Sequence, residues 1–177
     1  MYPVHRVALA MWRHRNDPPL KVGQFHVSRL ICTPGDIDIW MEMNNGRTLT
    51  LYDTGRFVHF RRMGIIDAMR KNKWAGTVAG VSVRYRRRVR LWDRVEMQTR
   101  LIGWDDRFSY GEQSMWVRGE ATSHMLIRMA VTGADGIVPP HDLAVATGND
   151  PESPPLPAWA ANWTEAEATR PWPPERD

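Results

Sequence analysis

The spacing of apolar residues changes after Trp74, and this change constrains the fold more than any other feature of the chain. From there on, apolar and polar residues alternate with a period of two, which is typical of strands that bury one face. The sequence predicts four long strands, over 77–88, 94–104, 108–118 and 121–132. The segments 105–107 and 118–120 have the composition of hairpin turns, so consecutive strands should pair antiparallel.

A long helix should precede these strands. Asn44 or Asn45 is a favourable N-cap for a helix that runs to about Arg62. Gly55 in its middle costs about 1 kcal/mol relative to alanine, which is understandable if the helix backbone packs very closely on a sheet. An extended segment over 22–33 and a short helix over 65–72 complete the predicted elements of this part. Together they indicate an α+β fold in which an antiparallel sheet curls round one helix.

The two ends of the chain differ in composition from the middle. Residues 1–21 should form an N-terminal helical arm, 22–138 the folded domain, and 139–177 a Pro- and Trp-rich C-terminal tail. The tail should contain short helices over 141–147 and 157–169, and Trp159 and Trp163 share a face of the second. We expect the tail to dock on apolar sheet surface; a lid over a ligand pocket is the alternative. For the arm, a docking helix is expected, and weak contact with a membrane or a neighbouring subunit is the alternative.

Composition excludes several classes of protein. With 42% hydrophobic and 25% charged residues, the 177-residue chain has the composition of a folded domain and not of a disordered one. The single cysteine, Cys32, rules out an intrachain disulfide and fits a reducing compartment, so we expect a cytoplasmic protein. No His, Asp or Glu spacing resembles a metal site, and none is expected. No apolar run approaches the roughly 20 residues of a transmembrane helix.

The candidate catalytic residues lie in the segment from Gly35 to Arg56, GDIDIWMEMNNGRTLTLYDTGR. Asp36 and Asp38 lie two apart, shortly before the predicted helix start at Asn44-Asn45-Gly46. Free backbone N–H groups at a helix N-terminus can bind an oxyanion or polarise a carbonyl group. A carboxylate facing such a helix end suits hydrolysis. The dipeptide pattern alone is more typical of acids that only cap a turn.

This order of residues resembles the thioesterase-like branch of the hot-dog superfamily, which includes relatives of 4-hydroxybenzoyl-CoA thioesterase and thioesterase-superfamily-member-6-like proteins. The resemblance covers roughly residues 22–165. It continues through 79–87 (AGVSVRYRR), 103–105 (GWD) and 110–113 (YGEQ). It implies a hot-dog fold that forms at least a homodimer, with the active cleft at the subunit interface. It also implies an acyl-CoA thioesterase-like hydrolase.

The resemblance further implies roles for single residues. Asp38 should be the nucleophile or general base, and the amides of Asn45 and Gly46 should polarise the thioester carbonyl, while Asp36 orients the loop. Relatives usually have histidine at the position of Glu42 and often tyrosine at that of Thr48. We include Glu42 among the catalytic residues, because a second carboxylate near Asp38 could raise the pKa of one of the two acids. The expected substrate-binding residues are Asn44, Thr48, His59, Arg86, Arg87 and Arg88.

A cluster of six arginines falls between Arg84 and Arg94. Such a cluster attracts a polyanion. Coenzyme A, as part of the substrate and not as a cofactor, is the expected ligand of Arg86 to Arg88. The alternative is that these arginines bind no ligand and form a solvated edge of the sheet. Nucleic acid is not expected, since aromatic residues do not alternate with the arginines as they do in RNA-binding strands.

Two other functions stay open. A non-catalytic acyl-CoA- or lipid-binding protein is favoured by the departures at Glu42 and Thr48. A dehydratase or hydratase of acyl thioesters would need a histidine and an acid that meet across the dimer, and no motif supplies that histidine.

Overall fold

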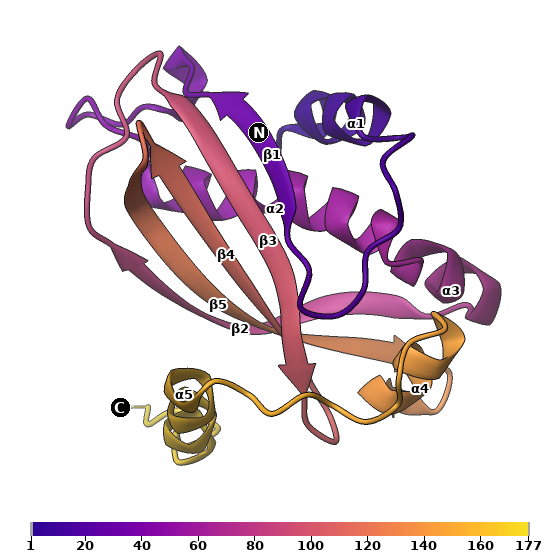
Figure 1. Cartoon of the computed structure of the whole chain (residues 1–177). Coiled ribbons are helices and arrows are strands. Elements are labelled where there is room, and N and C mark those ends of the chain that lie inside the picture. Colours follow the sequence, from indigo (N-terminus) through magenta and orange to yellow (C-terminus); the bar gives the residue numbers. More distant parts are fainter. Residues whose placement is uncertain (1, 177) are drawn as a thin grey trace.

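An antiparallel sheet curls round helix α2 (Asn45–Arg62) in this computed structural model, which describes residues 2–176 (Figure 1). Five strands follow one another in the order β1 (His26–Ile31), β3 (Arg94–Trp104), β4 (Ser109–Val117), β5 (Glu120–Gly133) and β2 (Ala75–Tyr85). The short β6 (Gly136–Val138) also pairs with β5. A long helix wrapped by a curled antiparallel sheet is the predicted α+β hot-dog arrangement.

Most predicted elements are present, although β1 covers only 26–31 of the predicted 22–33 and a 3-10 helix over Pro34–Asp36 was not predicted. Helix α3 (Ile65–Asn72) and strand β3 have the predicted ends. Strand β2 stops at Tyr85 and not at Arg88, because the N–H groups of Arg86 and Arg87 both bond to the Thr122 carbonyl oxygen, at 2.8 and 3.2 Å, which ends the ladder. Strand β6 was not predicted, since three residues are too few to reveal a period.

Helix α2 lies close against the sheet, as its central glycine predicted. A Cβ atom on Gly55 would come within 2.6 Å of Met97 Sδ and 3.0 Å of Thr99 Oγ1 on β3. The helix buries Leu51, Tyr52 and Val58 completely in the core between itself and the sheet. The glycine therefore sets how near the helix and the sheet can approach.

The two chain ends pack on different parts of this domain. Helix α1 (Val4–Arg13) contacts α2, where Arg61 Nη1 donates to the Met11 carbonyl oxygen at 2.8 Å. Helix α5 (Ala158–Ala168) lies on the face of the sheet opposite α2, over a cluster of buried apolar residues formed by Ile102, Tyr110, Leu126 and Ala160 (Figure 1). The short α4 (Pro140–Ala146) lies near α3. Within residues 2–176, no helix combines the length and the apolar character needed to cross a membrane.

Candidate active site

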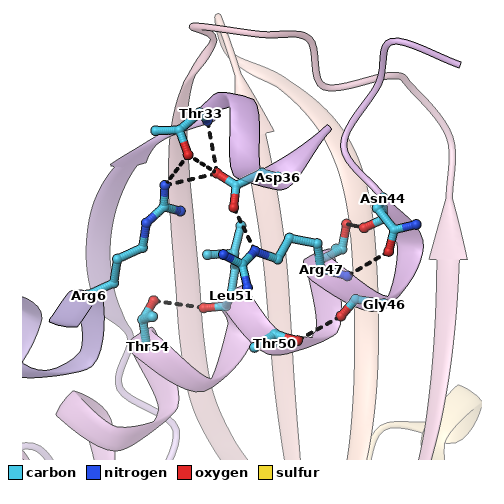
Figure 2. A network of polar contacts seen from close by, with 10 residues as sticks. Arg6, Thr33, Asp36, Asn44, Gly46, Arg47, Thr50, Leu51 and Thr54 are labelled. Carbon is cyan, nitrogen blue, oxygen red and sulfur yellow. Dashed lines mark hydrogen bonds and ion pairs between the residues drawn. The ribbon is translucent and has the colours of Figure 1, made fainter. Parts of the chain in front are cut away.

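The start of α2 is the centre of the candidate site. The Asn44 side chain accepts a hydrogen bond from the Arg47 N–H at 3.1 Å and so caps the helix (Figure 2). The first amides of a helix have no partner within it, so those of Asn45 and Gly46 carry the positive end of the helix dipole. A side chain on Gly46 would meet Asn44 Oδ1 at 3.3 Å, so glycine keeps this end of the helix open.

Asp36 fixes the loop that leads to this helix. Its side chain is buried and forms ion pairs with Arg6 at 2.9 Å and Arg47 at 2.7 Å (Figure 2). It also accepts hydrogen bonds from the Thr33 amide and hydroxyl group, at 2.9 and 2.8 Å. Burial alone would raise the pKa of Asp36, but hydrogen bonds from Arg47 and Thr33 and the charge of Arg6 hold it below its ordinary value. Asp36 is therefore a structural acid, as expected.

Asp38 lies in the tight loop between Asp36 and α2. Its Oδ1 accepts a hydrogen bond from the Trp40 N–H at 2.8 Å, and its own amide bonds to the Glu42 carbonyl oxygen at 2.9 Å. The side chain is half-buried and lines a hollow of about 460 Å³, together with Asn44, Arg47 and Thr50. Asp38 thus shares a hollow with the N-cap residue of α2, while one of its oxygens already caps the loop.

A second hollow, of about 240 Å³, lies on the other side of the helix start. Glu42, Asn45 and Thr48 line it from the helix side. Tyr85 and Ser123 contribute from the sheet, and the Tyr85 hydroxyl group donates to the Asn45 carbonyl oxygen at 3.2 Å. The expected residues Arg86, Arg87 and Arg88 complete its wall. Glu42, and not Asp38, is therefore the carboxylate in the hollow with the arginines.

The arginines follow the end of β2 and differ in their partners. Arg88 Nε lies 2.8 Å from Glu42 Oε2, and Arg87 Nε lies 3.2 Å from Glu120 Oε2. Arg86 has no ion pair within the described part of the chain. All three side chains are exposed, so their ion pairs are weak and open to competition from a phosphate group.

His59 is one expected site residue that the structure does not bring to the helix start. It lies fourteen positions after Asn45 on α2, which corresponds to about 20 Å along the helix axis. Its side chain is buried in the core, and burial lowers its pKa to about 4. The sequence places His59 on this helix but does not show which face of the helix is buried. Asp53 and Arg56, three positions apart on α2, form an ion pair.

A larger apolar hollow, of about 630 Å³, was not predicted. Phe57 and Phe60 of α2 line it together with Met69 of α3, and Trp74 and Val78 add apolar surface from the start of β2. It lies beside the C-terminal half of α2, whereas the two polar hollows lie at the N-terminal end. The apolar residues of α2 and α3 were visible in the sequence, but nothing there showed that they leave space between them.

Three residues of the kinds that bind metals meet where the arm joins the domain, although their spacing did not suggest it. Ligand atoms of His14, Asp17 and His26 lie within 4.8 Å of one another. However, Arg62 Nη1 lies 3.0 Å from His26 Nδ1 and 3.5 Å from Asp17 Oδ2. A guanidinium group already holds the position between two of the three groups, so the cluster does not fit a metal ion.

Comparisons with known proteins identify the family and the fold of the chain. The family described as the thioesterase-like superfamily matches residues 32–164. A Xenopus laevis protein, Protein THEM6, is 40% identical over 109 residues, which are 61% of this chain and 53% of that protein. Its namesake in Drosophila melanogaster is 37% identical over 84 residues, 47% of this chain and 44% of that protein. The chain thus spans about half the length of these relatives.

Solved structures show the same fold at low identity. YbaW, a probable thioesterase from Escherichia coli, has a TM-score of 0.63 at 16% identity, over 68% of this chain and 94% of that chain. A gentisyl-coenzyme A thioesterase, BH1999, has a TM-score of 0.60 at 14% identity, over 69% of this chain and 99% of that chain. These likenesses establish the hot-dog fold.

Proposed function

Since the chain belongs to the thioesterase-like superfamily, we propose that it is an acyl-CoA thioesterase-like hydrolase. The observation that carries the proposal is the start of α2, where the amides of Asn45 and Gly46 have no partner within the helix and a carboxylate lines a hollow on each side. This is the combination that hydrolysis of an activated acyl group needs: a group to activate or replace water, and donors for the developing oxyanion.

The reaction follows from these groups. Asp38 takes a proton from water, whose hydroxyl oxygen adds to the thioester carbonyl carbon and whose proton ends on the leaving thiolate. Alternatively, Asp38 attacks that carbon itself and forms a mixed anhydride, which water then hydrolyses to free the carboxylic acid and Asp38. The amides of Asn45 and Gly46 stabilise the negative charge that develops on the carbonyl oxygen. The carbon–sulfur bond then breaks, and the products are a carboxylic acid and free coenzyme A. Glu42 lies in the neighbouring hollow, where it forms an ion pair with Arg88.

Two further features support an acyl-CoA substrate. Arg86, Arg87 and Arg88 are exposed beside the helix start and can bind the phosphate groups of coenzyme A. The apolar hollow of about 630 Å³ has a volume typical of small-molecule sites and can take the acyl chain. Strand β2 connects the two hollows. Tyr85, at its end, and Arg86, just after it, line the polar hollow, and Val78 lines the apolar one.

The exposed edge of β2 supports a homodimer. Among the described residues β2 pairs only with β5, so its other edge is free. Val78, Val81 and Tyr85 are 51%, 42% and 42% exposed, and only Arg84 interrupts the strand with a charge. Natural proteins rarely leave a long edge of this kind open. Pairing of two β2 strands would cover it and would place a second subunit beside the apolar hollow.

Release of free thiol from a panel of acyl-CoAs tests the proposal. We expect turnover of at least one substrate, and we expect Asp38→Asn to lower kcat by about a hundredfold or more. Glu42→Gln should lower kcat less than Asp38→Asn does, because Glu42 lines the neighbouring hollow and pairs with Arg88. Asp106→Asn, an exposed acid in the β3–β4 turn, is the matched control and should leave turnover unchanged. Equal turnover by the wild type and Asp38→Asn would rule out Asp38 as the catalytic acid.

A non-catalytic acyl-CoA-binding protein is the second candidate. It is favoured by the partners of both carboxylates, since Asp38 bonds to the Trp40 amide and Glu42 pairs with Arg88. A rise in Tm with acyl-CoA but no thiol release from any panel member would support it. The hydratase alternative is weaker, because no histidine among the described residues lines either polar hollow.

A further inference from the structure

Large apolar side chains are exposed together at one end of the molecule. Ile39, Trp40 and Met41 form the tip of the loop before α2 and are 87%, 71% and 65% exposed. Trp92, which is 62% exposed, projects from the loop between β2 and β3. We call these four residues the apolar tip. Isolated exposed apolar residues are ordinary, whereas a group of this size marks an interaction site.

The two loops that carry the apolar tip are joined and anchored. The Met43 N–H bonds to the Val89 carbonyl oxygen at 2.8 Å, which ties the first loop to the second. The Trp92 N–H bonds to the Cys32 carbonyl oxygen at 2.9 Å, which ties the second loop to the end of β1. Met43, Val89 and Cys32 are buried. The same short loops therefore bury some of their apolar residues and leave the residues of the tip in solvent, so loose packing does not explain the exposure.

One of the two loops of the apolar tip, the β2–β3 loop, is rich in arginine. Arg86, Arg87, Arg88, Arg90 and Arg94 lie in or next to the β2–β3 loop, and all of them are exposed. Arg87 and Arg88 have carboxylate partners, while Arg86, Arg90 and Arg94 have no ion pair within residues 2–176. This end therefore combines exposed tryptophans with unpaired positive charge. Amphipathic tryptophan side chains and nearby basic residues are the chemistry of the interface of an anionic bilayer.

We propose that the apolar tip inserts into the surface of an anionic lipid bilayer, with Arg90 and Arg94 binding the lipid phosphate groups. Tryptophan lies at the level of the head groups, and isoleucine and methionine reach the adjoining acyl region. A hydrophobic pair of loops and a basic patch supply the two signals that stable attachment to a membrane requires. The proposal does not depend on hydrolase activity.

Charge and shape favour a bilayer over a second copy of this chain. In a symmetric contact, the arginine-rich β2–β3 loop of one copy would face the same loop of the other copy, and like charges oppose such contacts. The apolar tip is made of projecting loops and not of a groove that complements another surface. The long apolar edge that suits a second copy is β2, whereas the apolar tip lies in the loops beyond the C-terminal end of that strand.

Co-sedimentation of the whole chain with vesicles tests this inference. The wild type should bind vesicles of phosphatidylcholine with phosphatidylglycerol, and bind vesicles of phosphatidylcholine alone more weakly, with affinity that falls as salt rises. Trp40→Ser with Trp92→Ser should weaken binding by about tenfold or more. Arg90→Gln with Arg94→Gln should weaken binding only to the anionic vesicles, by about fivefold for each arginine.

The matched control is Trp159→Ser with Trp172→Ser, which removes two other exposed tryptophans, 43% and 89% exposed, from the C-terminal tail. Its binding should equal that of the wild type. Light scattering and thermal melting of each variant exclude a change of assembly or of folding. The proposal is overturned if the wild type does not bind anionic vesicles, or if both tryptophan pairs affect binding equally. It is also overturned if the loss of Trp40 and Trp92 changes the molecular mass in solution, which would assign the apolar tip to a second copy.

Discussion

Some single residues in this fold leave no room for a larger side chain, and Gly55 is the clearest case. Alanine at position 55 should favour the helix by about 1 kcal/mol. Its Cβ atom, however, would lie 2.6 Å from the sulfur atom of the fully buried Met97. We expect Gly55→Ala to lower the free energy of unfolding by about 1–3 kcal/mol, since overpacking costs more than the helix propensity gains.

Chemical denaturation measures this difference. Gly35→Ala is the matched control, because no atom lies within 4 Å of the position that its Cβ would take. The control should change stability by less than about 0.5 kcal/mol. If Gly55→Ala is as stable as the wild type, the helix and the sheet are less closely packed than described.

Two buried histidines make stability depend on pH. Burial lowers the pKa of His26 to about 3 and that of His59 to about 4, both below the ordinary value of 6.5. The unfolded chain therefore binds more protons than the folded chain below pH 6.5. The stability that these neutral histidines contribute is fully present above pH 6.5 and is lost as pH falls toward the folded-state values, by up to about 1.4 kcal/mol per pH unit for each.

Denaturation curves at a series of pH values between about 6.5 and 5 test this. We expect His59→Gln to halve the slope of stability against pH, whatever its effect on stability itself. His141→Gln, which removes an exposed histidine from α4, is the control and should leave the slope as it is. A slope that His59→Gln does not alter would show that His59 is protonated in the folded state.

Helix α5 is held by contacts with strands that are far away in the sequence. Trp163 packs against β2, where a side chain on Gly80 would meet its ring at 3.4 Å, and Arg128 lies over the ring at 5.5 Å from its centroid. We expect Trp163→Ala to lower the free energy of unfolding by about 2–4 kcal/mol. Trp159→Ala, at a 43% exposed position on the same helix, should have a smaller effect. Urea denaturation compares the two, and equal losses would contradict the docking of α5 through Trp163.

The sequence predicted elements better than it predicted the site. Periodicity is local, so it located α3 and β3 to the residue. The position of Asp38 relative to Glu42 depends on a loop of five residues, and no period shows that the two acids line different hollows. The convergence of His14, Asp17 and His26 depends on how the arm returns to β1, which only tertiary packing decides.

For the whole molecule, the free edge of β2 predicts self-association. A lysine in the middle of that edge should block pairing, because two copies would place charges opposite each other. We expect Val81→Lys to convert a dimer into a monomer, as measured by light scattering. Val27→Lys on β1, at a 38% exposed position on another strand, is the control and should remain a dimer. A Val81→Lys protein that keeps the wild-type mass would assign the interface to another surface.

The guanidinium group of Arg62, held between Asp17 and His26, has a consequence for how the arm stays attached. In many small domains such a junction is fastened by an ion taken up from solution, which a chelator can strip away. Here the positive charge is tethered covalently to the last turn of α2 and cannot be lost by dilution or dialysis. The arm should therefore remain in place in EDTA, and the chain needs nothing from its surroundings to close this junction.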